Sequence, residues 1–317
     1  MFIVTGGAGF IGANLVDVLN RRGDTNILVV DDLKHGDKFL NLRDLTIADY
    51  MDITEFRKAI RNGLFRNLRI SAMFHQGACS DTMESDGHYM MENNFTYSKE
   101  LLHFALEQSV PFVYASSAAT YGGSTTFREH PDNEKPLNVY GYSKLLFDQY
   151  AQRLFPRATA PVAGLRYFNV YGPRECHKGR MASMVHQLAT QIRTTGVARL
   201  FEGSGGYGPG EQQRDFIHVE DVVKVNLFLA ESGEVHGIFN VGTGVSRSFN
   251  DVARILVREM GRGEIHYFPM PESLRSKYQN FTRADIHRLR SVGYDTPFLT
   301  LEEGIRDYLR AEPCPVP

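Results

Sequence analysis

Tyr140 and Lys144 stand four residues apart in the stretch NVYGYSKLLFDQY. On a helix, residues at this spacing share one face, so the ammonium group of Lys144 would lie beside the phenol of Tyr140. A nearby positive charge stabilises phenolate and lowers the pKa of a tyrosine from about 10 towards neutral pH. Such a tyrosine can take a proton from an alcohol while a hydride leaves the same carbon, which indicates oxidation of a hydroxyl group. The pattern also arises by chance on exposed helices, so it needs support from the rest of the chain.

The segment TGGAGFIG at residues 5–12 supplies the matching cofactor signal. Gly7, Gly9 and Gly12 satisfy the pattern GxGxxG, and Gly6, Gly9 and Gly12 satisfy GxxGxxG. Glycines permit a tight turn and let the backbone approach a pyrophosphate, and the N-terminus of the following helix offers free N–H donors. Because the segment joins a predicted strand to a predicted helix, it predicts a site for NAD or NADP.

The end of the second predicted strand carries the residues that would choose between these cofactors. Asp31 lies about 20 residues beyond the glycines, where an acid normally binds the ribose hydroxyls of NAD. Its carboxylate would repel the 2′-phosphate of NADP unless a cation compensates, and Lys34 and Lys38 are close enough in sequence to do so. Charge alone leaves both cofactors open.

Three further segments could line the same site. Asp52 and Ile53 could flank the adenine, although Asp52 could equally cap the following helix. The small residues of HQGA at 75–78 end a strand and would allow a close backbone approach to a cofactor. Asn93 or Asn94 could form a hydrogen bond with the backbone that lies beneath the cofactor.

The loop YGPRECHKGRMAS at 171–183 raises a separate question. Arg174, His177, Lys178 and Arg180 fall within seven residues of it. A basic loop is usually a solvated surface, but one of these cations could belong to an active site. The loop by itself leaves the two interpretations open.

The elements that must position these residues alternate between short apolar runs and amphipathic helices. This rhythm predicts an α/β fold, a Rossmann doubly wound parallel sheet with helices on both faces and a smaller, interleaved α/β substrate domain. Beyond residue 168 glycine and proline become denser, and GSGGYGPG at 203–210 is the clearest flexible stretch. We expect strands at 2–4, 27–30, 73–75, 112–115, 162–167 and 238–241, and helices at 11–22, 93–108, 137–154 and from about 220. The NADP-binding Rossmann domain would comprise 1–168 and 213–240, and the substrate-binding domain 169–212 and 241–317.

Composition excludes several classes of protein. Hydrophobic residues make up 42% and charged residues 23% of the 317 residues, which is ordinary for a globular protein. The formal net charge of −2 gives no reason to expect nucleic acid as a partner. A strand begins at Phe2 and no run approaches ~18 apolar residues, so neither a signal peptide nor membrane association is expected. Cys79, Cys176 and Cys314 fit neither a disulfide framework nor a zinc site, so we expect a cytoplasmic location and no metal.

Four segments together resemble the extended short-chain dehydrogenases that act on nucleotide sugars: TGGAGFIG, SSAATYG, YGYSK and RYFNVYGPR. The resemblance implies that Tyr140 is the acid/base and that Lys144 holds the ribose of the cofactor and tunes Tyr140. It also implies that Ser117, four residues before Tyr121, bonds the hydroxyl of the substrate, although Ser116 is its neighbour.

Longer segments, such as DDLKHGDKFLNLRDLTIADYMD, RYFNVYGPRECHKGRMAS and KYQNFTRADIHRLRSVGYDTPF, closely resemble the ADP-L-glycero-D-manno-heptose 6-epimerase family. This implies epimerisation of ADP-D-glycero-D-manno-heptose at the exocyclic C6″ by transient oxidation to a ketone and return of the hydride, to supply heptose for the inner core of bacterial lipopolysaccharide. The oxygen on C6″ occupies a different position in each orientation, so a second proton donor is needed, and the lysine of the family falls on Lys178. The pKa of Lys178 would have to drop through burial or through Arg174, His177 and Arg180.

The same resemblance implies a tightly bound NADP in each subunit, with NAD as the other option, and a homo-oligomer, specifically a homopentamer. It also carries contacts over residue by residue, and Arg214 would pair with the diphosphate of ADP-heptose. The cofactor residues are Gly6, Gly9, Phe10, Ile11, Gly12, Asp31, Asp32, Lys38, Ile53, Gln76, Gly77, Ala78, Cys79, Ser80, Asn93, Lys144 and Val170. The substrate residues are Asn169, Arg180, Gln187, Phe201, Glu202, Gly203, Ser204, Arg214 and Tyr278.

Some positions depart from the family pattern. Arg180 stands where the family has a small serine, and Gln187 where it has a histidine. Ile53 replaces a lysine that helps to hold the 2′-phosphate, which leaves more of that task to Lys38. The segment 205–213 is longer than in the family, which puts the phosphate contacts in doubt.

Three rival functions are compatible with parts of this pattern. A nucleotide-sugar 4,6-dehydratase needs an Asp-Glu pair where Ala118 and Ala119 stand. A UDP-sugar 4-epimerase, or another nucleotide-sugar short-chain dehydrogenase, stays the alternative, although it has no use for Lys178. A cofactor-sensing regulator would be expected to lose Tyr140 or Lys144, and both are present.

Overall fold

The computed structural model describes residues 1–272 and 278–311. Its centre is a seven-stranded sheet in which all neighbouring strands run parallel. From β1 the strand order continues to β2 and β3 on one side and to β4, β5 and β6 on the other, so the topological switch point lies between β1 and β4. Open α/β sheets bind ligands at such a point, outside the carboxyl ends of the strands. The strands lie in the order β10 (His236–Val241), β6 (Val162–Tyr167), β5 (Phe112–Ser117), β4 (Ala72–His75), β1 (Phe2–Thr5), β2 (Ile27–Asp31) and β3 (Asp49–Asp52).

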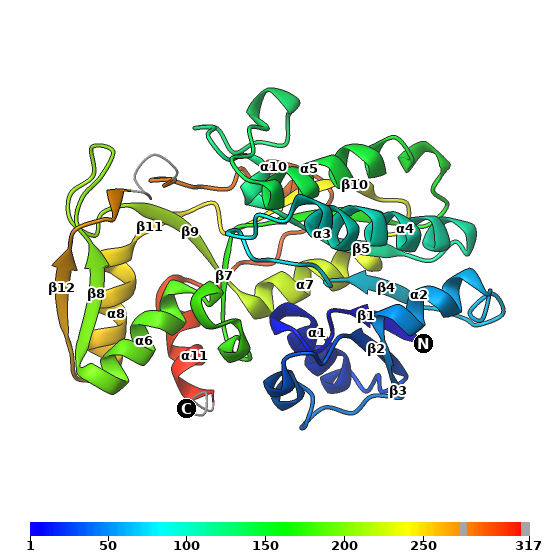
Figure 1. Ribbon diagram of the computed structural model, residues 1–317, viewed down its shortest axis with the longest axis horizontal. Helices are drawn as coiled ribbons and strands as arrows, with labels where there is room; N and C mark the ends of the chain where they lie inside the picture. The colour runs from blue at the N-terminus through cyan, green and yellow to red at the C-terminus, as the bar shows by residue number, and fades with distance from the viewer. Residues whose placement is uncertain (273–277, 312–317) are drawn as a thin grey trace.

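Helices cover both faces of this sheet (Figure 1). Successive strand residues point to opposite faces, so Val4 packs with one group of helices and Ile3 with the other. The helices on the Val4 face are α1 (Phe10–Arg21) and α7 (Val219–Ala230), and those on the Ile3 face are α2 (Ile53–Arg61), α4 (Tyr97–Glu107) and α5 (Val139–Gln152).

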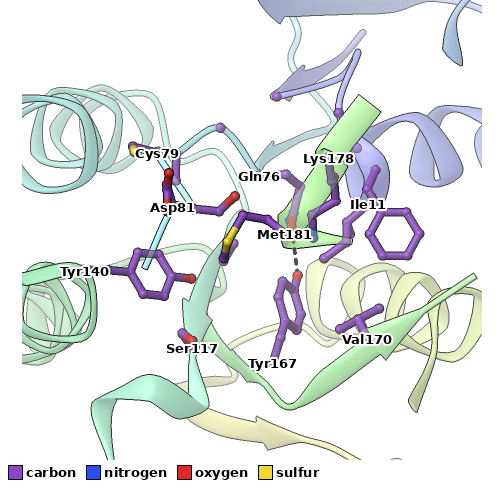
Figure 2. A pocket seen from close by; sticks show the side chains of 18 of the residues that line it. Ile11, Gln76, Cys79, Asp81, Ser117, Tyr140, Tyr167, Val170, Lys178 and Met181 are labelled. Carbon is purple, nitrogen blue, oxygen red and sulfur yellow. Dashed lines mark hydrogen bonds between the residues drawn. The ribbon is translucent and has the colours of Figure 1, made fainter. Parts of the chain in front are cut away.

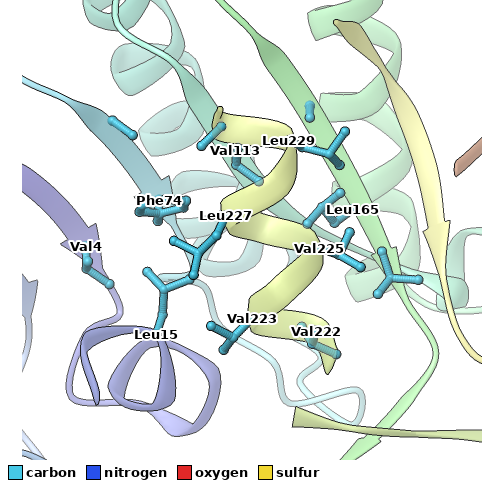
Figure 3. Close-up of a cluster of buried hydrophobic side chains, with 14 of the residues drawn as sticks. Val4, Leu15, Phe74, Val113, Leu165, Val222, Val223, Val225, Leu227 and Leu229 are labelled. Atoms are coloured by element: carbon cyan, nitrogen blue, oxygen red, sulfur yellow. The ribbon is translucent and has the colours of Figure 1, made fainter. Parts of the chain in front are cut away.

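The core on the α7 face holds the first helix against the sheet. Leu15 of α1 and Leu227 of α7 meet beside Val4 and Phe74, and the exposed fraction of each side chain is 1% or less (Figure 3). Burial of a leucine side chain contributes roughly 2 kcal/mol relative to exposure. This packing fixes the start of α1, and with it the glycine-rich turn, at the carboxyl end of β1.

A smaller lobe has its own apolar core, in which Val185, Leu188, Leu256 and Ile305 are fully buried. A three-stranded sheet crosses from this lobe to the central sheet (Figure 1). The lobe contains α6 (Met184–Thr195), β8 (Val197–Phe201), α8 (Phe249–Met260), β12 (Glu264–Phe268) and α11 (Leu301–Arg310), and the crossing sheet contains β7 (Asn169–Tyr171), β9 (Gln213–His218) and β11 (Ser246–Ser248). Shorter elements are η1 (Gly36–Asn41), α3 (Gly87–Met91), η2 (Glu92–Thr96), η3 (Ala118–Thr120), η4 (Pro131–Asn133), η5 (Phe155–Arg157), η6 (Cys176–Met181) and α10 (His287–Ser291).

The doubly wound parallel sheet predicted from the sequence is confirmed, and all six predicted strands are present. The predicted helix at 93–108 differs, because its first turn is the π-helical η2 and regular α-helix begins at Tyr97. The interleaved domain boundaries stay a prediction. Leu289 and Tyr294 belong to the core of the larger lobe, although both fall within the predicted substrate domain.

Two expectations drawn from composition can be compared with the structure. Within the described residues, no helix has the length and apolar character needed to cross a membrane. Cys79 is a free thiol. Cys314 lies outside the described residues. The cytoplasmic location stays a prediction.

Candidate active site

A cavity of about 600 Å³ lies beyond the carboxyl ends of β1, β2, β4 and β5 and reaches the start of α6. Every residue that the sequence assigned to the cofactor lines this cavity. Ser117, Tyr140, Lys178 and Asn169 line it as well. The fold therefore brings the predicted catalytic and cofactor residues together, although each individual contact with a ligand stays a prediction.

The glycine-rich turn is shaped to leave room for a ligand. Gly6 has a φ of +67°, and a Cβ atom added to it would lie 2.6 Å from the nitrogen of Gly77. A Cβ atom on Gly12 would clash with the carbonyl oxygen of Gly6. Helix α1 begins after Gly9 without a side-chain cap and without an acidic residue in its first turn. Its N-terminal N–H groups are therefore open to a pyrophosphate, and the turn fits a dinucleotide.

Asp31 and Lys38 form an ion pair where the ribose of the adenosine is expected. The ammonium group of Lys38 donates to Asp31 Oδ1 at 2.6 Å, to Asp32 Oδ1 at 2.9 Å and to the backbone oxygen of Asp32 at 3.0 Å. Asp31 Oδ2 accepts a hydrogen bond from the backbone nitrogen of Ala8 at 2.9 Å. Burial raises the pKa of Asp31, and Lys38 offsets this only in part. Burial alone would lower the pKa of Lys38, but the two carboxylates outweigh it and raise the pKa.

The side chain of Asn94 holds the segment that follows β4 through hydrogen bonds to its backbone. Its side-chain nitrogen donates to the carbonyl oxygen of Cys79, and its side-chain oxygen accepts from the Cys79 nitrogen, both at 2.9 Å. Asn93 instead donates to the carbonyl oxygen of Tyr89. Of the two asparagines left open by the sequence, Asn94 therefore supports the backbone. The side chain of Asp52 accepts from the nitrogen of Thr54, so Asp52 caps α2.

Tyr140 and Lys144 lie in the first turns of α5, which Asn138 caps by accepting from the nitrogen of Gly141. The ammonium group of Lys144 is only 4% exposed and donates to the carbonyl oxygen of Ala115 at 2.8 Å. Burial lowers the pKa of Lys144 to about 8, against the opposing effect of Asp148.

The pKa of Tyr140 moves opposite to the expected direction. Burial raises it, and a hydrogen bond with Ser117 lowers it only in part. The expectation that Lys144 lowers the pKa of Tyr140 is therefore wrong, because desolvation dominates and the ammonium group of Lys144 is directed to a backbone oxygen. Ser117 is the partner of Tyr140, whereas Ser116 donates to Asp148 at 2.8 Å.

Lys178 enters the cavity from the side opposite Tyr140 (Figure 2). Its ammonium group lies 5.3 Å from the ring centroid of Phe10. Burial lowers the pKa of Lys178, and Glu175 opposes the shift. The predicted decrease is therefore present, but its cause is burial rather than neighbouring cations, because Arg174 pairs with Asp44 and Arg180 with Asp81.

Part of the predicted substrate site gathers in the smaller lobe. The guanidinium of Arg214 lies 5.4 Å from the ring centroid of Phe249 and 5.2 Å from that of Tyr278, and the ring of Phe201 meets Tyr278 edge-on. Arg214 is 8% exposed, and burial lowers its pKa. Among the described residues no carboxylate pairs with it, so a diphosphate would provide the missing charge. The hydroxyl of Ser204 donates to Asn280 at 2.7 Å.

Arg180 and Gln187 do not line the cavity. The side chain of Arg180 is 71% exposed and donates to Asp81 at 2.7 Å. Gln187 donates to the carbonyl oxygen of Ala182 at 2.7 Å and so supports the start of α6. Their assignment to the substrate rests on the family resemblance alone and stays a prediction, as do the assignments of Glu202 and Gly203.

Several residues that line the cavity were not predicted from the sequence, among them Tyr167, Met181 and His177. The hydroxyl of Tyr167 donates to Gln76 Oε1 at 2.9 Å, across the floor of the cavity (Figure 2). Met181 also lines the cavity, and no pattern in the sequence pointed to it. His177 was treated only as a nearby charge, but burial lowers its pKa to about 4, which leaves it neutral.

Comparison with known proteins places this architecture in a family. Residues 2–242 match the NAD dependent epimerase/dehydratase family. This chain belongs to that family. The epimerase/dehydratase family member "ADP-L-glycero-D-manno-heptose-6-epimerase" of Alkalilimnicola ehrlichii is 55% identical over 313 residues, which cover 98% of this chain and 97% of the relative.

Two solved structures show the same fold within the epimerase/dehydratase family. The Helicobacter pylori ADP-L-glycero-D-manno-heptose-6-epimerase aligns with a TM-score of 0.83 and 33% identity, over 97% of this chain and 94% of the other. The UDP-glucose 4-epimerase of Thermus thermophilus, in complex with NAD, aligns with a TM-score of 0.78 and 26% identity, over 98% and 99% of the two chains. The UDP-sugar enzyme is thus less similar to this chain than the heptose enzymes.

Proposed function

We propose that this protein interconverts ADP-D-glycero-D-manno-heptose and ADP-L-glycero-D-manno-heptose by epimerisation at C6″. The observation that carries the proposal is the placement of Lys178 opposite Tyr140 across one cavity (Figure 2). The 55% identity with an enzyme of that name supports the same substrate. The reaction would supply heptose for the lipopolysaccharide inner core.

The chemistry needs a nicotinamide held beside C6″ to accept a hydride and to give it back. The glycine turn, Asp31, the segment 76–80 and Lys144 would hold this cofactor, and all of them line the same cavity. Lys144 donates to the backbone and has little freedom, so it fixes the position of a ribose rather than moving with the substrate.

Tyr140 and Lys178 divide the proton transfers between two orientations of the substrate. In one orientation the C6″ hydroxyl would face Tyr140, with Ser117 as its hydrogen-bond partner. After oxidation, rotation about the bond to the sugar ring would turn the C6″ oxygen towards Lys178. Burial lowers the pKa of the Lys178 ammonium group, which makes it a better proton donor than an exposed lysine.

For the cofactor, the NADP expected from the sequence stays a prediction, and the contacts of Lys38 support NAD as the other option. All three hydrogens of the Lys38 ammonium group are directed to Asp31 and Asp32, and Ile53 contributes no charge. A 2′-phosphate would have to draw Lys38 away from two carboxylates, whereas ribose hydroxyls could donate to Asp31 directly. We therefore infer that NAD is preferred over NADP, as in the NAD complex of the Thermus thermophilus relative.

The nucleotide half of the substrate would lie in the smaller lobe. Arg214 would neutralise the diphosphate, and Phe201 and Tyr278 would surround the adenosine side. A homo-oligomer, with five subunits as the family resemblance implies, stays a prediction.

Purified protein tests the proposal against the alternative of a UDP-sugar 4-epimerase. Incubation with ADP-D-glycero-D-manno-heptose should give the L-glycero epimer, and incubation with UDP-glucose should give no UDP-galactose. Conversion of UDP-glucose without conversion of ADP-heptose would establish the alternative.

A further inference from the structure

The loop that carries Lys178 is fastened to the larger lobe, although it leads into α6 of the smaller lobe. We define the Lys178 loop as residues 172–183, between β7 and α6. Its hydrogen bonds reach the first helix and η1, and Asn41 of η1 also bonds the glycine-rich turn. All three of these elements border the cofactor end of the cavity. The position of Lys178, the proposed second proton donor, is therefore set by residues that lie beside the expected cofactor.

Asn41, the last residue of η1, is the main connection. Its side-chain nitrogen donates to the carbonyl oxygen of Ala8 in the glycine-rich turn at 3.0 Å and to that of Arg174 in the Lys178 loop at 3.1 Å. The same nitrogen lies 3.1 Å from His177 Nδ1. Asn41 is 7% exposed, so these bonds are shielded from water and costly to leave unmade. One amide group thus joins the turn to the residue that precedes Lys178.

Two further contacts lie beside this connection. The side-chain nitrogen of Asn14 in α1 donates to the carbonyl oxygen of Pro173 at 2.9 Å. The guanidinium of Arg174 binds both carboxylate oxygens of Asp44, at 2.9 and 2.7 Å, and donates to the carbonyl oxygen of Asn41. Arg174 has a φ of +72°, an unfavourable backbone conformation for a residue with a Cβ atom, which these contacts maintain.

Glu175 closes the Lys178 loop on itself. It is 1% exposed and accepts hydrogen bonds from the nitrogen and hydroxyl of Ser183 and from the nitrogen of Gly172. Gly172 and Ser183 are the two ends of the loop. The backbone nitrogen of Lys178 donates to the carbonyl oxygen of Glu175 at 3.0 Å. Glu175 therefore ties the two ends of the loop together. Asn41, Asn14 and Asp44 contact the loop at residues 173–177, next to Lys178, whereas the side chain of Gln187 in α6 contacts it at Arg180 and Ala182, beyond Lys178.

We propose that Asn41 is a positioning residue that couples the glycine-rich turn to Lys178, so that Lys178 is placed by the cofactor-binding lobe and not by the substrate-binding lobe. The inference rests on the proposed function for the role of Lys178. A displacement of about 1 Å of a catalytic group can cost up to ~100-fold in rate, so loss of one buried amide is enough to show the effect.

The test is a double-mutant cycle between Asn41→Ala and Lys178→Met. Asn41→Ala should lower kcat for epimerisation by ~10-fold or more and leave the KM for ADP-heptose within about threefold. In the Lys178→Met background the same change should cause no further loss, because the residue that Asn41 positions is gone. Independent losses that multiply in the double variant would overturn the proposal.

Asn20→Ala is the matched control. Asn20 donates to the carbonyl oxygens of Asp24 and Thr46 and accepts from the nitrogen of Thr46, so it makes a comparable number of backbone contacts in the same lobe. It has no hydrogen bond to the Lys178 loop. Asn20→Ala should keep kcat within about twofold of the wild type, and a loss equal to that of Asn41→Ala would overturn the proposal.

Hydrogen exchange separates this inference from the proposed function. In cofactor-free protein, Asn41→Ala should speed amide exchange in residues 174–178 by ~10-fold or more, whereas Asn20→Ala should not. Unchanged exchange in Asn41→Ala would overturn the anchoring even if the enzyme is active. Faster exchange in a protein that fails to convert ADP-heptose would leave the anchoring intact and refute the proposed function. Asp44→Asn, at an exposed side chain, should show the same exchange effect on a smaller scale if Asn41→Ala does not fold.

Discussion

At the scale of single residues, burial rather than charge pairing controls the reactive groups. Tyr140, Lys144 and Lys178 all have pKa values displaced in the direction that favours the neutral form. Side-chain types and spacing were enough to identify Tyr140 and Lys144 in the sequence. The direction of the Tyr140 shift was not predictable, because it depends on desolvation by residues far apart in the chain.

Removal of the Lys178 amine should abolish epimerisation but not binding. Lys178→Met keeps an unbranched apolar side chain of similar length and removes the ammonium group above Phe10, so cofactor affinity should stay within about threefold. Turnover of ADP-heptose should fall by ~100-fold or more, the usual contribution of a general acid/base. Arg180→Met, at an exposed position in the same loop, serves as the comparison. Near-normal turnover in Lys178→Met would return Lys178 to the role of a surface residue.

Lys144 should destabilise the ligand-free protein at neutral pH. Its pKa is about 8 in the folded protein and about 10.4 in an unfolded chain, so the unfolded state binds more protons between these values and stability rises with pH there. Lys144→Met should therefore raise the thermal midpoint at pH 7 and increase the free energy of unfolding by up to about 3 kcal/mol. Both gains should be smaller at pH 10. Lys58→Met, at an exposed lysine, should show neither effect. A pH-independent difference would contradict this account.

The carboxylate of Asp32 should contribute to the proposed preference for NAD. Asp32→Asn removes one negative charge beside Lys38 and should improve binding of NADP relative to NAD by up to about 1 kcal/mol, roughly fivefold, since the group is half exposed. Lys38→Ala should weaken binding of NADP more than that of NAD. Titration calorimetry of both nucleotides measures these ratios. Tight NADP and weak NAD binding by the wild type would contradict the preference.

At the scale of elements, α1 begins at the glycine-rich turn and has no side chain at its N-cap that accepts a hydrogen bond. Asp52, Asn138, Ser183, Ser248 and Thr300 provide such caps for five other helices. The glycine pattern in the sequence predicted this site because it is local. The contact of Asn41 with His177 joins residues 136 apart in the chain. The position of Tyr278 beside Arg214 depends on how β9 packs. Neither contact could be predicted from sequence periodicity.

A single methyl group at Gly12 should damage the cofactor site. Its Cβ atom would clash with the carbonyl oxygen of Gly6, so the turn must shift before α1 can keep its place on the sheet. Gly12→Ala should weaken NAD binding by ~10-fold or more, measured by calorimetry. Gly87→Ala adds a Cβ atom at an ordinary 3.9 Å from Val139 and should leave binding unchanged. Equal affinity in the two variants would contradict the role assigned to the turn.

At the scale of the whole molecule, two lobes supply different parts of one reaction site. The larger lobe provides the glycine turn, Tyr140 and the anchors of the Lys178 loop, all at one cavity, and in the proposed function the smaller lobe provides Arg214 and its aromatic neighbours for the nucleotide half of the substrate. Strand and helix periodicity predicted the larger lobe because its βαβ units are regular. The smaller lobe is assembled from segments before and after β9, so its arrangement came only from resemblance and from the structure.

The central claim, that hydride leaves and returns to the same carbon within one active site, is tested most directly with labelled substrate. ADP-D-glycero-D-manno-heptose that carries deuterium at C6″ is incubated with the enzyme in ordinary water, and the product is analysed by NMR and mass spectrometry. The account predicts that the L-glycero product keeps the deuterium at C6″ and that, in the reverse arrangement, deuterium from heavy water does not enter. Exchange of the C6″ hydrogen with solvent would contradict it and would indicate deprotonation of carbon instead of hydride return.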